Sequence, residues 1–301
     1  MSDEATGRPD TAPLPVRVHD NHTHLNFSHD VPEWADGEEP PGLADAVAEL
    51  DAAELVGVAG VVQVGTNLAD SRWAVALAER DDRVLAAVAI HPNDAPELAR
   101  AGGLDAALAV LDGLAAHPRV RALGETGLDW FRLPGEAGGP DGDGAERARA
   151  VDAQLASFEA HIAIAKRHGL AVQIHDRDAH DAVLEVLRRV GAPERTVLHC
   201  FSGDADVARR ALDAGCHLSF AGTVTFKNAG YLREALALAP ADRLLVETDA
   251  PFLTPHPFRG RRNAPSFIPV TLRAMAEVRG VGVDAFGERV RDNAIEVYGS
   301  W

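Results

Sequence analysis

The sequence predicts a single (β/α)8 barrel, which is a closed parallel sheet surrounded by helices. Short apolar runs of strand type alternate with alanine- and leucine-rich stretches of helical spacing from Val16 onward. Strands that alternate with helices are typical of a parallel sheet with crossover helices. The chain has 301 residues, and barrels of this kind routinely need about 200–250 residues as one domain.

Eight apolar runs are the expected strands. They are short, as we expect for strands that are covered by helices outside the barrel and by packed side chains inside it. They are Val16–Val18, Val58–Val64, Val84–Ile90, Val120–Gly124, Leu170–Ile174, Thr196–Leu198, His217–Phe220 and Arg243–Val246. The expected helices include Leu43–Leu55, Ser71–Glu79, Val151–Arg167, Ala179–Val190 and Asp206–Ala214.

Three segments do not follow this alternation of strands and helices. Residues 1–15 are polar and acidic and contain proline, which predicts a short disordered leader before a domain that spans residues 16–301. Ser28–Gly42 and Pro134–Gly144 are rich in glycine, proline and acids, and are expected to be surface loops. Both follow strand ends, so they either cover part of the barrel mouth or are tolerated insertions.

Composition narrows the class of protein. No run of about 18 apolar residues exists, so we expect no membrane-spanning helix. Two cysteines without a pairing pattern favour the reducing cytoplasm. The net charge of −17 argues against a protein that coats nucleic acid through cationic patches. An enzyme that engages phosphates locally remains open, and no obligate protein partner is evident.

Residues that bind metal ions or move protons follow the predicted strands. The carboxyl ends of barrel strands converge on one face, where active sites lie. His22 and His24 are two residues apart, so on an extended segment both imidazoles point the same way. The full predicted ligand set is His22, His24, Glu125, His175, His199 and Asp249. For each histidine taken singly, the alternative is a packing or surface residue without a metal.

Six ligands would crowd one ion, whereas two ions about 3.5–4 Å apart use them economically. Imidazoles and carboxylates together suit Zn²⁺, Mn²⁺, Fe²⁺ or Co²⁺ better than an all-oxygen Mg²⁺ site. The expected cofactors are two divalent metal ions. Zn and Mn suit this ligand set, and Mg is kept as a third candidate. Such ions make water more acidic, and Asp249 can bind an ion and also accept the proton of the attacking water.

Six motifs in the order of the chain resemble the TatD family of metal-dependent deoxyribonucleases, which has an amidohydrolase-like (β/α)8 barrel. The resemblance covers about Val16 to Tyr298 and implies metal-dependent DNA hydrolysis, including 3′-to-5′ exonuclease activity. Some relatives of this family are associated with hydrolysis of D-aminoacyl-tRNA. The motifs are HDNHTHL, AIHP, GETGLDW, QIHDRDA, HCFSG and ETDAPFLTP.

The resemblance also implies a role for each metal ligand. His22 and His24 match the ligands of one ion, and Glu125 matches the carboxylate that bridges both ions. His175 and His199 match the ligands of the second ion.

Two more positions match the family pattern. Asp249 matches a ligand of the first ion and the proton acceptor, so Glu125 and Asp249 are the expected catalytic residues. His91 matches a histidine that faces the substrate.

Arginines near the predicted barrel mouth are the candidates for phosphate binding. Arg259, Arg261 and Arg262 follow the last strand, and Arg177 ends the fifth. Guanidinium groups hold phosphates with paired hydrogen bonds, which favours DNA or another phosphodiester as the substrate. The alternative is an exposed, solubilising patch.

Two other functions stay open at this point. The same metal arrangement suits cleavage of amides, esters or lactones, because it polarises carbonyl groups as well. A barrel alone does not decide the chemistry. A metal-binding scaffold without catalytic activity is the second alternative.

Overall fold

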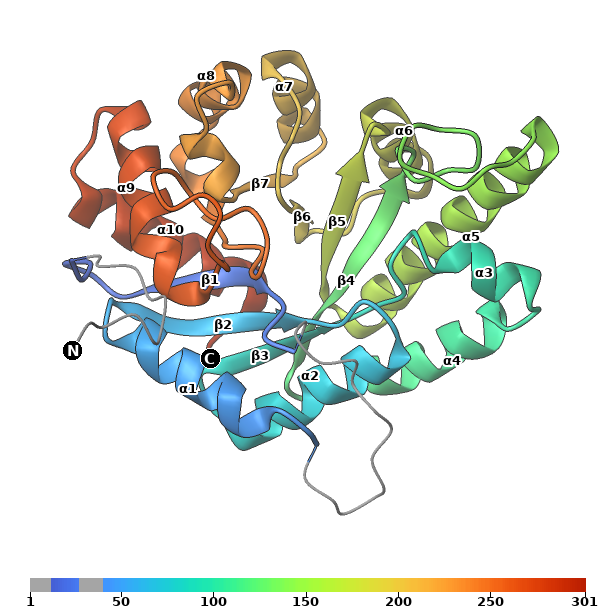
Figure 1. Ribbon diagram of the computed structural model, residues 1–301, viewed down its shortest axis with the longest axis horizontal. Coiled ribbons are helices and arrows are strands. Elements are labelled where there is room, and N and C mark those ends of the chain that lie inside the picture. The colour runs from blue at the N-terminus through green and yellow to red at the C-terminus, as the bar shows by residue number, and fades with distance from the viewer. Residues whose placement is uncertain (1–11, 27–39) are drawn as a thin grey trace.

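The computed structural model describes residues 12–26 and 40–301 and confirms the predicted barrel (Figure 1). One eight-stranded sheet follows the order β1 to β8, and all consecutive strands pair in parallel. The strands are β1 (Val18–Thr23), β2 (Val58–Val64), β3 (Val84–Val88), β4 (Val120–Asp129), β5 (Ala171–Arg177), β6 (Thr196–Leu198), β7 (His217–Phe220) and β8 (Leu244–Val246).

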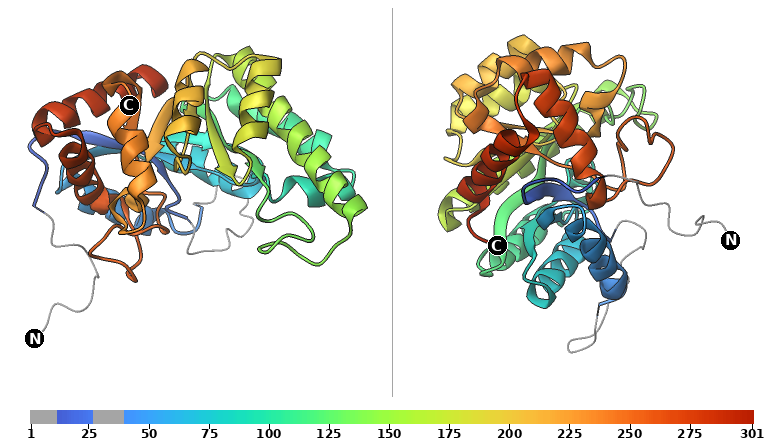
Figure 2. Two further views of the ribbon diagram at one scale, coloured as in Figure 1. Left: turned by 90° about the horizontal axis from the view of Figure 1, so that it is seen from above. Right: turned by 90° about the vertical axis from the view of Figure 1, so that its left-hand side faces the viewer.

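Helices surround the sheet, as the views in Figure 2 show. A parallel sheet requires crossover connections, and a helix that returns the chain also covers the outer face of the strands. The helices are α1 (Leu43–Glu54), α2 (Leu68–Arg80), α3 (Ala95–Arg100), α4 (Leu104–Ala115), α5 (Gly144–His168), α6 (His180–Val190), α7 (Ala205–Asp213), α8 (Gly230–Leu238), α9 (Ile268–Arg279) and α10 (Val283–Tyr298). Short 3₁₀ turns are η1 (Gly222–Thr225), η2 (Ala241–Arg243) and η3 (Pro265–Phe267).

Contacts between β1 and the segment after β8 bring the two ends of the sheet together. Thr23 and Ala250 form a parallel bridge. The backbone N–H of Asp249 donates to the carbonyl of His22 at 3.0 Å, and that of His24 donates to Ala250 at 2.8 Å. The sheet therefore closes at three of the predicted metal ligands, which fixes their backbones relative to one another.

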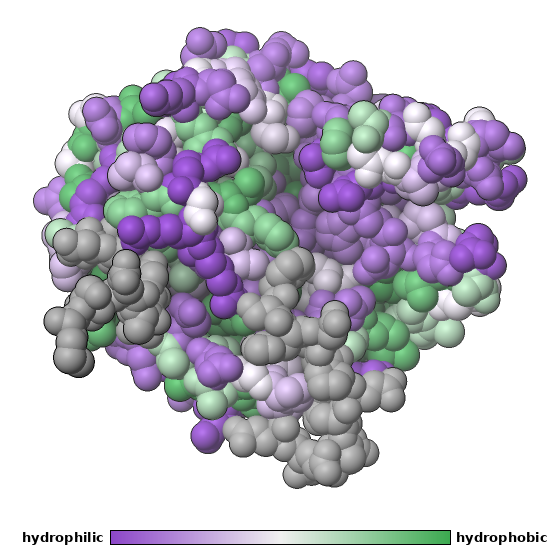
Figure 3. Space-filling view, in the orientation of Figure 1, coloured by the Kyte–Doolittle hydropathy of each residue, from purple (hydrophilic) through white to green (hydrophobic). Residues whose placement is uncertain are grey.

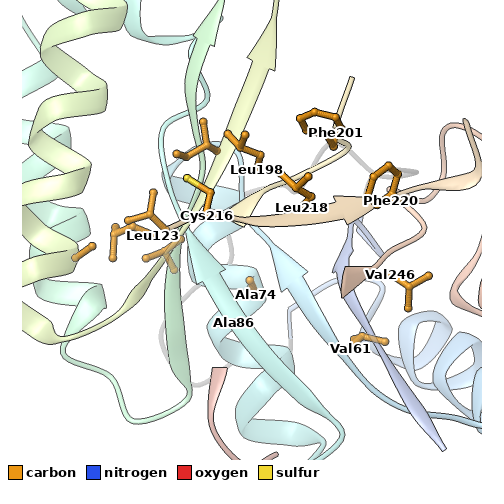
Figure 4. Close-up of a cluster of buried hydrophobic side chains, with 14 of the residues drawn as sticks. Val61, Ala74, Ala86, Leu123, Leu198, Phe201, Cys216, Leu218, Phe220 and Val246 are labelled. Carbon is orange, nitrogen blue, oxygen red and sulfur yellow. The ribbon is translucent and has the colours of Figure 1, made fainter. Parts of the chain in front are cut away.

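Apolar side chains form two layers because successive residues of a strand point to opposite faces. Val61 and Leu123 belong to the outer layer between strands and helices, and Figure 4 shows part of this layer. Val62 and Ala122, one residue away in each strand, belong to the inner layer. Ala294, Val297 and Tyr298 of α10 also belong to this inner layer.

Tyr298 and Trp301 pack at the end of the barrel opposite the predicted site. The Trp301 ring stacks on His19 with 3.8 Å between centroids, and its Nε1–H donates to the Val61 carbonyl at 3.2 Å. The Tyr298 hydroxyl donates to Asn21 Oδ1 at 3.0 Å. A polar layer of the barrel interior thus separates the inner apolar layer from the site.

Several strand boundaries differ from the prediction. β3 ends at Val88 and not at Ile90, and β8 begins at Leu244 and not at Arg243. β1 begins at Val18, where we expected it to end, and runs to Thr23. β4 and β5 extend as far as Asp129 and Arg177, which pair with each other. The apolar pattern stops where the strands enter the polar mouth of the barrel, but the backbone ladder continues there. Several predicted site residues therefore lie within strands and not after them.

The predicted terminal and loop segments are only partly described. Residues 1–11 of the leader and 28–39 of the first loop lie outside the described residues. Leu14 is buried, and its N–H donates to the Val56 carbonyl at 3.0 Å. In the second loop, Gly138 donates its N–H to the carbonyl of Phe131 at 3.2 Å, against whose ring it packs.

Two features bear on the predicted cytoplasmic location of the protein. Across residues 12–26 and 40–301, no helix has both the length and the apolar character needed to cross a membrane. Cys200 and Cys216 are both free, and a cytoplasmic location stays a prediction.

Candidate metal centre

The predicted ligands converge around the carboxylate of Glu125. On one side, its Oε2 lies 3.7 Å from His22 Nε2 and 3.6 Å from His24 Nε2. The Oδ1 of Asp249 lies 3.8 Å from His22 Nε2 and 3.6 Å from His24 Nε2. The two imidazole nitrogens are 3.2 Å apart. These four side chains form the first half of the centre. His22 belongs to β1, His24 directly follows it, Glu125 belongs to β4, and Asp249 follows β8.

The other oxygen of Glu125 faces a second group of histidines. Its Oε1 accepts a hydrogen bond from His175 Nδ1 at 2.5 Å. The same oxygen lies 3.0 Å from His199 Nε2 and 3.3 Å from His91 Nε2. One carboxylate thus separates two groups of ligands, with one oxygen directed at each group.

A bulge in β4 turns Glu125 into the barrel. Between the pairs Leu123–Val172 and Thr126–Ile174, β4 advances by one residue more than β5 does. Ala122 already points inward, so strict alternation would turn Glu125 outward, and the extra residue reverses this phase. Gly124 is required here because a Cβ atom on it would lie 2.5 Å from Gln173 Cβ.

Asp20 joins the two segments that carry the first half of the centre. Its Oδ1 accepts hydrogen bonds from the backbone N–H of Thr248 at 2.9 Å and of His22 at 3.3 Å, and its Oδ2 accepts one from the Thr248 hydroxyl at 2.5 Å. Burial raises the pKa of Asp20 to about 8. Asp249 adopts a left-handed conformation with φ of 54°, which aspartate tolerates better than most residues.

Most of the histidines use their second ring nitrogen to contact the protein. His24 Nδ1 lies 3.0 Å from the Val64 carbonyl, and His199 Nδ1 lies 3.1 Å from Glu247 Oε1. His175 Nε2 lies 3.2 Å from Asp129 Oδ2. Such partners fix the tautomer and the orientation of an imidazole that binds a metal.

The sequence placed Glu247 and Asp129 near strand ends but did not assign them a role. Glu247 lies two residues before Asp249, so the strand period was a signal that both point into the barrel. The depth of each side chain decides their different contacts, and the sequence does not carry this information. Glu247 is fully buried, whereas the side chain of Asp249 is 14% exposed.

Neighbouring charged groups set the ionisation of Glu125 and His175. Burial alone would raise the pKa of Glu125, but the charges of His199 and His91 hold it well below its usual range. Burial alone would lower the pKa of His175, but hydrogen bonds to Asp129 and Glu125 raise it to about 9. Glu125 is therefore anionic and His175 is protonated around neutral pH, so cations stabilise the carboxylate at the centre.

The donor set fits divalent metal ions. Two nitrogens that bind one tetrahedral ion at about 2.0–2.1 Å lie about 3.3 Å apart, close to the 3.2 Å between His22 and His24. The distances from these nitrogens to Glu125 and Asp249, 3.6–3.8 Å, correspond to wider angles at a shared ion. His175 and His199 are closer to Glu125, at hydrogen-bond distance, so the second group has to spread to admit an ion.

The predicted arginines lie around the mouth of the barrel and not among these ligands. The Arg177 guanidinium lies 3.9 Å from the centroid of the Phe131 ring, and that of Arg259 lies 3.9 Å from the centroid of Phe226. Arg261 and Arg262 are exposed. Figure 3 shows a hollow on one face of the molecule, with hydrophilic side chains gathered on its right side and hydrophobic ones on its left.

Comparison with protein families now identifies the chain. The family model of the TatD-related DNases matches residues 19–299. This chain belongs to the TatD family. The match begins at the second residue of β1 and covers β2 to β8 and every predicted metal ligand, so the family resemblance of the six motifs is confirmed.

Relatives of the TatD family support this assignment along the chain. An uncharacterized metal-dependent hydrolase TatD from Mycobacterium tuberculosis is 46% identical over 85% of this chain and 92% of its own length. A 3′-5′ ssDNA/RNA exonuclease TatD from Musicola paradisiaca is 37% identical over 85% of this chain and 92% of its own length. The structure of the TatD homolog YJJV from Escherichia coli matches with a TM-score of 0.76 and 28% identity, over 94% of this chain and 98% of that one.

Proposed function

We propose that this TatD-type metal-dependent hydrolase cleaves phosphodiester bonds of DNA and removes nucleotides from the 3′ end. The observation that carries the proposal is the position of Glu125, whose two oxygens face two separate groups of ligands. A carboxylate in this position can bridge two ions, and two-metal sites suit the in-line displacement at phosphorus. The exonuclease activity for which the relative from Musicola paradisiaca is named agrees with this chemistry.

Each half of the centre would hold one divalent ion. Bound there, the ions would supply Lewis acidity, which makes water a better nucleophile and stabilises negative charge on the phosphate. The first ion would bind His22, His24 and Asp249, the second would bind His175 and His199, and Glu125 would bind both.

The side chains have separate tasks in the proposed reaction. Asp249 accepts the proton of the attacking water, because its carboxylate is anionic and borders the first group of ligands. His91, with its Nε2 at 3.3 Å from Glu125 Oε1, faces the substrate from the second group. Arg177 and the arginines after β8 hold phosphate oxygens through paired hydrogen bonds.

Replacing Glu125 by alanine tests the assignment of the centre. Loss of the shared carboxylate should abolish binding of both ions, and metal analysis after dialysis against Zn²⁺ or Mn²⁺ measures this. Glu234→Ala, which removes an exposed carboxylate from α8, is the control and should keep the wild-type stoichiometry. Retention of both ions by the Glu125→Ala protein would contradict the bridging role.

A substrate panel tests the chemistry. Metal-loaded protein should shorten 5′-labelled single-stranded DNA from its 3′ end and release mononucleotides. Chelation of the metals should stop this shortening. Turnover of carboxylic esters, lactones or aminoacyl-tRNA without nucleotide release would support the rival hydrolase instead. Binding of metal without turnover of any substrate would support a scaffold.

A further inference from the structure

A row of polar side chains crosses the interior of the barrel and leads to the metal centre. Asn21 belongs to β1, Gln173 to β5, Ser219 to β7 and Tyr298 to α10, and Glu247 follows β8. All five are fully buried. Buried polar groups are costly without hydrogen bonds, and these side chains bond mainly to one another. Their hydrogen bonds connect the end of the last helix with the second group of ligands.

The carbonyl group of Val246 fixes the orientation of the Asn21 amide. The Nδ2 atom of Asn21 lies 2.7 Å from the Val246 carbonyl oxygen. Because a carbonyl only accepts hydrogen bonds, this amide atom must be the NH2 group, and Oδ1 is the acceptor on the other side. The Tyr298 hydroxyl therefore donates to Asn21 Oδ1 at 3.0 Å. The second N–H of the Asn21 amide donates to Ser219 Oγ at 2.7 Å.

The carboxylate of Glu247 fixes the direction of the next hydrogen bond. Ser219 Oγ lies 2.5 Å from Glu247 Oε2. An ionised carboxylate only accepts, so the hydroxyl proton of Ser219 points at Glu247 and a lone pair of the same oxygen accepts from Asn21. At the other end, Gln173 Nε2 donates to the Asn21 carbonyl at 2.6 Å and to the Tyr298 oxygen at 2.8 Å. The donors thus all point in one direction, from Gln173 and Tyr298 to Glu247.

Glu247 connects this row with the metal centre. Its Oε2 accepts from Ser219, and its Oε1 accepts from the backbone N–H of Cys200 at 2.8 Å and from His199 Nδ1 at 3.1 Å. Neither oxygen can turn without losing a hydrogen bond, so the His199 ring meets a carboxylate of fixed orientation. Loss of the Ser219 hydroxyl would remove the bond to Oε2 and allow the carboxylate to rotate. The orientation of His199 would then be less restricted, which weakens metal binding at its Nε2.

We propose that Ser219 and Tyr298, which Asn21 connects, are positioning residues for the ion of the second group of ligands. They act through Glu247 and not through contacts with the ion or the substrate. Hydrogen bonds that point in one direction polarise one another, so removal of an outer member also weakens the bond at the inner end. The last helix, α10, packs against β1 and β8 and thereby contributes to the geometry of the metal centre. This inference rests on the proposed function, because it assumes the second ion.

Competition with a chromophoric chelator for Zn²⁺ tests these roles, because it measures both metal affinities of the protein without a substrate. His199→Ala, which removes a proposed ligand of the second ion, identifies which affinity belongs to which ion. Ser219→Ala should weaken binding of the second ion about tenfold, the lower end of the usual effect of removing a partner outside the ligands. Tyr298→Phe should weaken the same ion by a smaller factor, because its effect passes through Asn21 and Ser219. The affinity for the first ion should not change in either variant.

Each variant has a matched control elsewhere in the chain. Ser157→Ala removes the hydroxyl of a buried serine on α5, and Tyr231→Phe removes the hydroxyl of an exposed tyrosine on α8. Both controls should keep both affinities of the wild type. Wild-type affinity for the second ion in Ser219→Ala or in Tyr298→Phe would overturn the role of that residue. Equal weakening of both ions would also overturn it, because this is the result expected of a purely structural role.

A double variant tests whether the effect passes through Glu247. The Ser219→Ala/Glu247→Gln protein should lose less affinity for the second ion than the product of the two single fold-losses, because both changes act on one contact to His199. Losses that multiply in full would show that Ser219 acts by another route and would overturn the proposal.

The wild-type protein separates this inference from the proposed function. Two bound ions and cleavage of DNA by the wild type, with an unchanged second ion in Ser219→Ala, would refute the positioning role alone. Two bound ions without cleavage of DNA would refute the proposed phosphodiesterase activity, and the affinities of the variants would still decide the positioning role. Fewer than two ions in the wild type would refute the two-metal centre and this inference with it.

Discussion

Replacing Glu247 by glutamine tests how the protein orients one half of the metal centre. Glu247 is fully buried and accepts three hydrogen bonds. They come from His199 Nδ1 at 3.1 Å, the backbone N–H of Cys200 at 2.8 Å and the Ser219 hydroxyl at 2.5 Å. With Nδ1–H donated to a carboxylate, His199 would be able to present the lone pair of its Nε2 to an ion in the second group of ligands. Glutamine keeps the shape of the side chain but has no charge and only one acceptor oxygen.

The expected loss of metal affinity in the Glu247→Gln protein follows from these hydrogen bonds. A hydrogen bond to a charged group contributes about 1.5–3 kcal/mol and a neutral one about 0.5–1.5 kcal/mol, so the bond to His199 weakens by about 1–1.5 kcal/mol. Loss of such an outer partner typically lowers metal affinity about 10-fold to 100-fold. We expect Glu247→Gln to weaken about tenfold the binding of the ion that we propose for His199 and His175. The affinity for the ion that we propose for His22, His24 and Asp249 should not change.

Competition between the protein and a chromophoric chelator for Zn²⁺ measures both affinities. Glu234→Gln is the matched control, because it makes the same chemical change at an exposed position of α8. Two unchanged affinities in the Glu247→Gln protein would refute the role of this carboxylate. Equal weakening of both sites would show that the substitution acts through the whole barrel and not through His199.

Two further predictions concern stability. Burial lowers the pKa of His161 to about 4, below its usual 6.5 in the unfolded chain. The free energy of unfolding should therefore fall by up to roughly 3 kcal/mol as the pH drops from 6.5 to 4. Urea unfolding of His161→Gln should show a smaller pH dependence, and parallel curves for both proteins would contradict this reasoning. Trp301→Ala should lower the free energy of unfolding by about 2–4 kcal/mol, because the stack on His19 and the bond to Val61 are lost. Thermal unfolding measures the change, and a loss below about 0.5 kcal/mol would show that Trp301 contributes little to the closed end of the barrel.

The sequence by itself determined the architecture and the identity of the converging side chains. Apolar periodicity is local, so it is readable wherever a strand is covered on both faces. The parallel topology then required the ends of distant strands to meet at one face. His22, Glu125, His199 and Asp249 were expected together on this ground, and the structure places each of these side chains within 3.8 Å of another of them.

Tertiary structure decided how these side chains are oriented and which partners they contact. The bulge before Thr126 directs Glu125 inward, and it depends on the register between β4 and β5. The partners of His175 and His199, Asp129 and Glu247, depend on the depth of each residue in the barrel. Register and depth arise from packing between segments far apart in the chain, so no local pattern of residues encodes them.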